Sequence, residues 1–151
     1  MGMTAQISPR RLRVLYLHPT LEIGGAEELR YTVLRHLDRS RYDVRLCCLA
    51  SKGAIGEEIE RLGYPVRALG RSPRTTALAT TAAVYRVLQD TPVDIIQTSL
   101  FYANWHGRVA ARWAGVPIVI AEEHSLHDPS AGHVRYSPRL GLVFRWADRA
   151  L

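Results

Sequence analysis

Short apolar runs alternate with longer amphipathic runs through most of the chain. The first apolar run, residues 13–18, precedes a segment in which Ala26, Leu29, Val33 and Leu37 recur at every third or fourth position. That spacing indicates a helix, whereas short runs rich in β-branched and aromatic residues indicate buried strands. We predict strands at 13–18, 42–49, 65–69, 93–99 and 117–121, and helices at 26–37, 55–62, 73–90, 101–114 and 137–146.

Strands that alternate with helices predict an α/β fold with a parallel sheet. Because crossovers between parallel strands are right-handed, we expect a doubly wound, Rossmann-like sheet with helices on both faces. Ligands of such sheets bind beyond the carboxyl ends of the strands. The loops that follow the predicted strands are therefore where a functional site is expected.

Two of the predicted helices have apolar positions that share one face. Leu78, Ala82, Tyr85 and Leu88 align in the helix at 73–90. In the helix at 101–114 the aligned residues are Tyr102, Trp105, Val109 and Trp113. We expect Trp105 and Trp113 to be core contacts rather than a platform for an acceptor.

Length and charge bound the remaining possibilities. The 151 residues suit one domain, which we place at 13–151 after an N-terminal extension at 1–12. The net charge is +6, and every basic residue except Lys52 is arginine. The arginines are spread along the chain, so we predict no nucleic-acid partner. The apolar run after the basic start is too short for a secretory signal, so a cytoplasmic protein is expected. Cys47 and Cys48 are adjacent and should face opposite sides of a strand.

A pair of glycines, Gly24 and Gly25, stands in the loop after the first predicted strand. Glycines at a helix N-terminus let backbone amides approach an anion closely, and the helix dipole adds about half a positive charge there. The spacing is neither the dinucleotide fingerprint nor a P-loop. The pattern fits a phosphate or diphosphate site, and it also fits an ordinary tight turn.

A polar segment, 122–136, follows the fifth predicted strand and begins Glu122-Glu123-His124. His124 is placed to touch a ligand above the sheet edge, where it could hydrogen-bond a sugar hydroxyl or a developing oxyanion. The segment lacks cysteines and a helical histidine pair, so we predict no metal site. The alternative is a solvated polar loop.

These segments together resemble the N-terminal domain of the GT-B glycosyltransferases of family 4. The resemblance covers about residues 13–151. It rests on the glycine loop in RVLYLHPTLEIGGAEELR, on GAIGEEIERLGYPVRALG, and on VDIIQTSLFYANWHGRVAARWAGVPIVIAEEHSLHD. It implies a retaining transfer of sugar from a nucleotide-sugar donor to a glycan, lipid-linked or small-molecule acceptor. No cofactor is implied beyond that substrate.

The resemblance also implies roles for individual residues. Gly24 and Gly25 would bring backbone amides to the donor diphosphate, and His124 would be the active-site histidine beside the transferred sugar. The family often has His-x-His at the end of the fourth strand, where this chain has Gln97 and Ser99, which do not titrate near neutral pH. The candidate acceptor-binding residues are Gln97, Ser99, Asn104 and Glu123.

The last predicted helix carries a basic face that could lie on an anionic membrane surface. We favour an ordinary solvated arginine face. Because relatives act on lipid-linked acceptors, the alternative is peripheral contact with the inner membrane face. The residues of this face are Arg135, Arg139, Arg145, Trp146 and Arg149.

The residues 147–151 look like the start of a further strand, so we expect a chain truncated within a larger GT-B protein. The donor-binding C-terminal domain would act in cis or in trans, and this chain alone would be inactive. The alternative function is a non-catalytic domain or fragment that binds a partner or a phosphorylated ligand without turnover. An open sheet edge should leave the chain marginally stable or self-associating.

Overall fold

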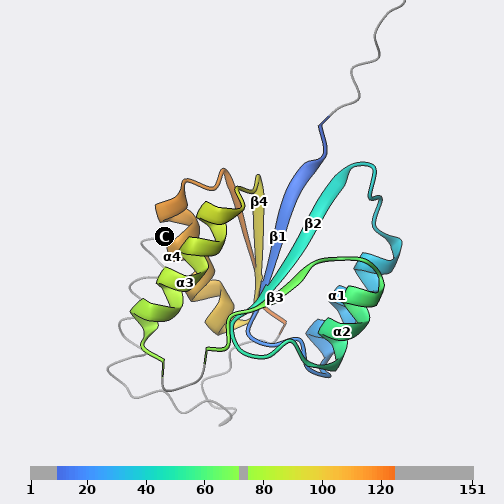
Figure 1. Ribbon diagram of the computed structural model, residues 1–151, viewed down its shortest axis with the longest axis horizontal. Coiled ribbons are helices and arrows are strands. Elements are labelled where there is room, and N and C mark those ends of the chain that lie inside the picture. Colours follow the sequence, from blue (N-terminus) through green and yellow to red (C-terminus); the bar gives the residue numbers. More distant parts are fainter. Residues whose placement is uncertain (1–9, 72–74, 125–151) are drawn as a thin grey trace, which may run out of the picture.

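The protein is described by a computed structural model over residues 10–71 and 75–124, and the elements within these ranges form one sheet covered by helices (Figure 1). The strands are β1 (Leu12–His18), β2 (Tyr42–Cys48), β3 (Val66–Ala68), β4 (Ile95–Ser99) and β5 (Ile118–Glu122). The helices are α1 (Gly25–His36), α2 (Gly53–Arg61), α3 (Ala77–Asp90) and α4 (Phe101–Ala114). The predicted elements at 137–146 and 147–151 and most of the N-terminal extension lie outside the described residues.

All neighbouring strands run parallel, in the order β3-β2-β1-β4-β5. Strand β1 lies in the middle of the sheet; β2 and β3 follow on one side of it, and β4 and β5 on the other. Helices α1 and α2 cover one face, while α3 and α4 cover the other (Figure 1). This arrangement confirms the predicted doubly wound, Rossmann-like fold, and it brings the carboxyl ends of β1, β4 and β5 to one edge.

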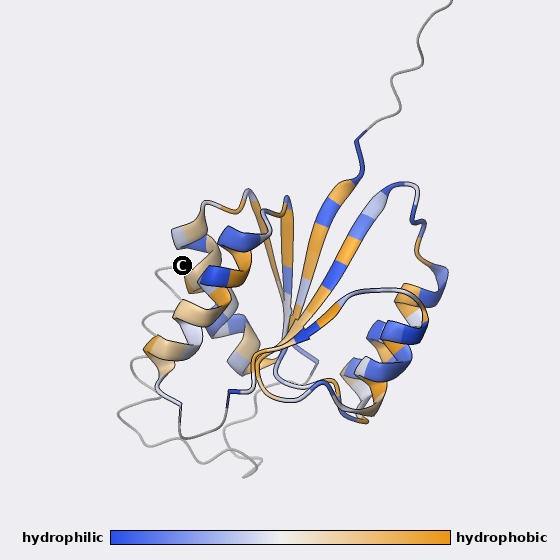
Figure 2. Ribbon diagram, viewed as in Figure 1, coloured by the Kyte–Doolittle hydropathy of each residue, from blue (hydrophilic) through white to orange (hydrophobic). Residues whose placement is uncertain are grey.

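The two faces of the sheet carry separate hydrophobic cores. Along β1, Leu15 and Leu17 pack toward α3 and α4, whereas Val14 and Tyr16 pack toward α1 and α2. Figure 2 shows hydrophobic residues along the strands and hydrophilic ones on the outward sides of α1 and α2. The adjacent cysteines belong to different cores and are both free, as predicted from the alternation of side chains along a strand.

The predicted aromatic stripe of α4 does not face the core. Tyr102 and Trp113 are each 56% exposed, and Trp105 and Val109 are half-buried. The expectation that Trp113 is a core contact is therefore wrong. The helix instead buries a row of small or polar residues against the sheet and α3: Ala103, Asn104, His106, Gly107, Ala110 and Ala111.

Gly107 shows why small residues take that row. A Cβ on Gly107 would collide with the methyl group of Thr98 and would lie 2.9 Å from Leu17 Cδ2. The backbone of α4 thus approaches β1 and β4 more closely than a helix with large side chains on this face could. The large side chains of Tyr102 and Trp113 lie outside this row and are exposed.

The predicted apolar stripe of α1 is also rotated away from the core. Leu29 and Val33 are 50% and 37% exposed, whereas Glu27, Arg30 and Leu34 are buried. The spacing predicted the helix, but its buried face is formed by other residues than the apolar ones that recur in the sequence. The reason is that Arg30 pairs with Glu122 at the end of β5, as described below, so a charged side chain lies on the buried face of α1.

Helix α3 begins later than predicted. Thr76 is its N-cap and accepts a hydrogen bond from the backbone N–H of Ala79, so the helix starts at Ala77 rather than at residue 73. Leu78 is 70% exposed, and the buried stripe runs through Val84, Val87 and Leu88. Among the described residues no helix is long and apolar enough to cross a membrane.

Candidate functional site

A cavity of about 450 Å³ opens at the carboxyl edge of the sheet, where the N-terminus of α1 meets the ends of β4 and β5. Its position is the one expected for the binding site of a doubly wound sheet. Two residues predicted for the site, Gly25 and His124, face this cavity although they are 99 positions apart in the chain. The lining residues are Gly25, Ala26, Glu27, Leu100 and His124.

The two glycines of the first loop have different roles. Gly24 is the N-cap of α1, and the carboxylate of Glu27 fills the space that a Cβ on Gly24 would need. Nothing lies within 4 Å of the Cβ position of Gly25, so the missing side chain there leaves the cavity open. Gly25 lines the cavity, whereas Gly24 is not among its lining residues.

The start of α1 offers backbone donors to this cavity. The first intrahelical hydrogen bond of α1 runs from the N–H of Glu28 to the carbonyl of Gly24, at 2.9 Å. The N–H groups of Gly25, Ala26 and Glu27 therefore have no acceptor within the helix. Together with the helix dipole, they provide a positive potential at the cavity. The arrangement can bind an anionic group.

Leu100, at the opposite side of the cavity, has a strained backbone. Its φ of 69° and ψ of 156° lie in a region that only glycine adopts readily. Two hydrogen bonds hold this conformation: the N–H of Leu100 donates to the carbonyl of Glu122 at 3.0 Å, and its own carbonyl accepts from the N–H of Asn104 at 2.9 Å. The loop from β4 to α4 thus forces a leucine side chain to line the cavity.

This strain predicts an inverted order of stability at position 100. Leu100→Gly is expected to be more stable than Leu100→Ala by about 1–2 kcal/mol, because only glycine relieves the strained backbone. At Leu78, an exposed position inside α3, the matched pair should show the usual order, with alanine better by about 1 kcal/mol. Urea denaturation of the four variants measures both differences. An alanine variant as stable as the glycine variant at position 100 would show that the backbone there is unstrained.

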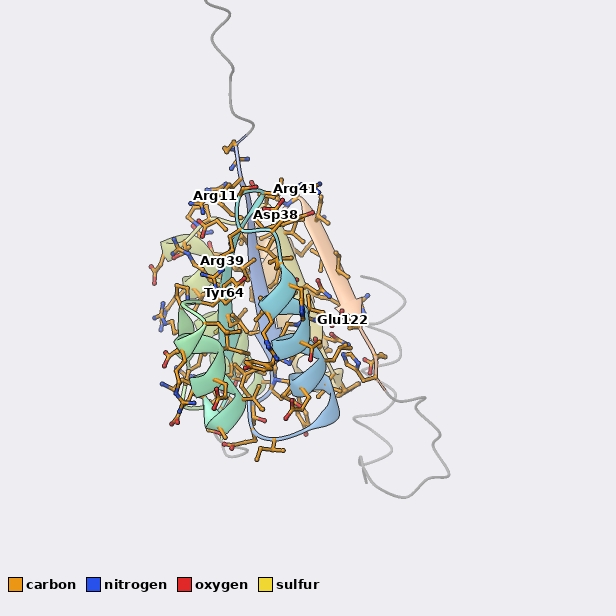
Figure 3. All side chains as sticks on the ribbon, turned by 90° about the vertical axis from the view of Figure 1, so that its right-hand side faces the viewer. Arg11, Asp38, Arg39, Arg41, Tyr64 and Glu122 are labelled. Carbon is orange, nitrogen blue, oxygen red and sulfur yellow. The ribbon has the colours of Figure 1, made fainter. Side chains whose placement is uncertain are left out.

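Glu122 is the centre of the polar contacts beside the cavity. It is the last residue of β5, paired with Ser99 of β4, and not the first residue of a loop as predicted. Its carboxylate accepts hydrogen bonds from Ser99 Oγ, at 2.8 Å, and from the side-chain amide of Gln97. Figure 3 shows Glu122 beside α1, near the carboxyl end of β5.

The predicted acceptor-binding residues therefore lie close together, and all of them contact the end of β5. Asn104 Nδ2 donates to the carbonyl of Glu122, at 3.0 Å, and to Glu123 Oε1, at 2.5 Å. Thr98 Oγ1 donates to Asn104 Oδ1 at 2.7 Å. Gln97 and Ser99 are engaged by the same Glu122 carboxylate. Their role in binding an acceptor stays a prediction.

Arg30 brings a buried positive charge to this cluster from α1. Its Nη2 lies 2.5 Å from Glu122 Oε2, its guanidinium carbon lies 3.8 Å from the ring centre of Tyr16, and its Nε donates to His18 Nε2 at 3.4 Å. His18 is fully buried at the end of β1. Since the Nε2 of His18 accepts, its proton is on Nδ1, which has no hydrogen-bond partner among the described residues.

The charges of the cluster follow from these contacts. Burial alone would raise the pKa of Glu122, but the hydrogen bond from Ser99 and the positive charge of Arg30 hold it below its usual value. Burial and the neighbouring Arg30 lower the pKa of His18 to about 4. At neutral pH the cluster therefore contains an ionised Glu122, a charged Arg30 and a neutral His18.

The sequence reasoning missed Arg30 and Glu122 as site residues. For Glu122 a signal existed, because Ile118, Ile120 and Glu122 alternate and so share one face of β5. For Arg30 there was none, since its partner lies 92 residues away. The predicted basic face of Arg135, Arg139, Arg145, Trp146 and Arg149 lies outside the described residues. Within residues 10–71 and 75–124 no group of three histidine, cysteine or acidic side chains is placed to hold a metal ion.

Comparison with solved structures supports the fold. A UDP-N-acetylglucosamine 2-epimerase superposes with a TM-score of 0.56 at 16% identity, covering 80% of this chain and 34% of the epimerase. The UDP-GlcNAc 2-epimerase from Neisseria meningitidis bound to UDP-GlcNAc gives a TM-score of 0.55 at 16% identity. That match covers 88% of this chain and 39% of the epimerase. At this identity the likeness shows the fold alone. The chain spans little more than a third of either enzyme.

The sequence itself decides the family. No curated protein matches the chain significantly. The family model described as Glycosyltransferase Family 4 matches residues 23–151, which is most of the chain and includes the glycine loop and His124. Because the match covers well over half of the sequence, the chain belongs to glycosyltransferase family 4.

Proposed function

We propose that this chain is the acceptor-side half of a retaining glycosyltransferase that takes its sugar from a nucleotide-diphosphate donor. The donor diphosphate would lie on the first-turn backbone amides of α1, beside Gly25. His124 would contact the transferred sugar across the same cavity. The observation that carries the proposal is that one cavity is lined by both Gly25 and His124.

The electrostatics of the cavity support an anionic ligand only at the helix end. The dipole of α1 and its first-turn amides favour a diphosphate, while Glu27 lines the same cavity and Glu122 lies near it. Arg30 compensates the charge of Glu122 from within the protein. The binding energy that this half supplies should therefore be modest, and the nucleoside would be held by the second domain of a GT-B enzyme.

The acceptor would occupy the region around the ends of β4 and β5. Glu123 and the exposed ring of Tyr102 lie there, while the buried Asn104 holds the Glu123 carboxylate through its Nδ2. Hydroxyl groups of a glycan or of a lipid-linked sugar suit the carboxylate of Glu123, and Asn104 would act by positioning it. An acceptor in this position would lie on the same side of the sheet edge as His124.

The proposal predicts weak binding of a nucleoside diphosphate that depends on Gly25. UDP is the first probe, because one solved structure of the same fold is described as bound to UDP-GlcNAc. We expect a millimolar Kd, equivalent to about −4 kcal/mol, in a titration followed by tryptophan fluorescence or amide chemical shifts. Gly25→Val should weaken binding at least about tenfold, since its side chain would project into the cavity beside the first-turn amides.

The matched control is Ala77→Val, which adds the same β-branched side chain at the first residue of another helix, α3, where the position is also exposed. It should leave the Kd unchanged. His124→Ala should leave the affinity for UDP unchanged but remove any gain from an attached sugar. If the native chain binds neither UDP, GDP nor their sugars, the diphosphate site is not on this half, and the non-catalytic alternative gains support.

A further inference from the structure

Glu122 is held in place by three side-chain donors from two elements, α1 and β4. Arg30 of α1 and Ser99 of β4 both contact its Oε2, at 2.5 and 2.8 Å, and Gln97 of β4 donates to its Oε1. Its backbone is fixed as well, since its carbonyl accepts from the N–H of Leu100. The position of the carboxylate is therefore determined by the sheet and by α1, independently of any ligand.

His124 lies two residues after the end of β5, where no strand pairing is left to fix its orientation. The Nε2 atom of His124 is 3.5 Å from Glu122 Oε2. The backbone thus places His124 at the cavity, where its ring lies next to the fixed carboxylate of Glu122. A carboxylate in this relation to an imidazole restricts the orientation of the ring.

We propose that Glu122 is the positioning residue for His124, and that Arg30 keeps Glu122 in place. The inference rests on the proposed function in one respect, namely that His124 is the group that meets the transferred sugar. Arg30 has a second effect. By compensating the carboxylate charge from the protein side, it lets Glu122 hold the histidine without presenting a bare negative charge to a diphosphate nearby.

The test measures the side-chain conformation of His124 directly. Three-bond couplings to its Cγ, measured by NMR on labelled protein, report how many χ1 rotamers the ring populates. In the native chain we expect one dominant rotamer. Glu122→Gln keeps the size of the side chain but loses the charge, and it should give averaged couplings at His124. Glu28→Gln, which neutralises an exposed carboxylate on α1, should leave them unchanged.

A second variant protects the test against a folding defect. Glu122→Asp keeps the charge but withdraws the carboxylate by one methylene, so it should also produce averaging at His124. Native-like backbone spectra of at least one of the two variants are required for the comparison. A single His124 rotamer in a folded Glu122→Gln or Glu122→Asp protein would overturn the proposal.

Titration with UDP separates this inference from the proposed function. If the couplings average in the variants but the native chain binds no UDP or UDP-sugar, the positioning role stands and the diphosphate site falls. If the native chain binds UDP and its sugars while the couplings of His124 do not respond to Glu122, the site stands and the positioning role is wrong.

Discussion

Truncation of Glu122 to alanine is expected to lower the free energy of unfolding by about 3 kcal/mol, because it leaves the charge of Arg30 buried without a partner. The side chain of Arg30 is almost fully buried, so water cannot replace the lost carboxylate easily. The contact with His18 does not help, because a neutral imidazole carries no compensating charge. Because Glu122 itself is partly exposed, the expected loss is smaller than for a fully buried pair.

Removing both charges should cost much less than removing one. In Arg30→Met/Glu122→Ala no buried charge remains, and the methionine can still pack on the ring of Tyr16. We expect a coupling energy of about 2 kcal/mol or more from a double-mutant cycle in urea. The pair of Arg67 and Asp90 is the control, since its side chains are 57% and 61% exposed.

The exposed control pair should couple by less than about 0.5 kcal/mol. Equal coupling energies in the two cycles would mean that the pair at the end of β5 behaves like a surface ion pair. In that case Arg30 would not hold the Glu122 side chain in position. The arrangement of the cluster would then depend only on the pairing of β4 with β5.

The order of strands and helices could be predicted because it depends on local pattern. Buried strands are short apolar runs, and the helices between them are long enough to show their period. The faces of the helices were predicted less well. In α4 the sequence shows large aromatic residues on one side, yet Gly107 and its small neighbours pack on the sheet, since close approach of a helix backbone requires small side chains.

Some residues of the candidate site could be predicted from the sequence, and others could not. Gly25 and His124 could be placed from sequence because each follows a strand, and a parallel sheet brings those positions together. Arg30 could not, since a charged residue on a helix is assigned to solvent unless its partner is known. The predicted fifth strand ended at residue 121, so Glu122 was assigned to the following loop although it is the last residue of β5. Nothing in the sequence indicates the strained backbone at Leu100, because that backbone conformation does not favour leucine.

Acidification should destabilise this protein between about pH 6.5 and pH 4 because two of its histidines are buried in the neutral form. Burial lowers the pKa of His18 to about 4, with a contribution from Arg30, and burial alone does the same for His106. His106 also lies 2.8 Å, through Nδ1, from Thr81 Oγ1 inside the pair formed by α3 and α4.

The sign follows from which state binds more protons. Near pH 5 the unfolded chain has both imidazoles protonated, whereas the folded chain has both neutral, so unfolding takes up about two protons. The stabilising contribution is therefore fully present above pH 6.5 and is lost as the pH falls toward 4. With one pKa step equal to 1.36 kcal/mol, each histidine accounts for about 3 kcal/mol over this interval.

Urea denaturation at a series of pH values from 7.5 to 4.5 measures this dependence. His106→Gln and His18→Gln should each flatten the fall of the free energy of unfolding by about half, because each removes one of the two protons taken up. His36→Gln, at the exposed end of α1, is the control and should leave the slope as it is. A slope unaffected by either buried substitution would show that both histidines have the same pKa in the folded and the unfolded chain. The packing of His106 between α3 and α4, and of His18 beneath Arg30, would then have to be looser than the structure indicates.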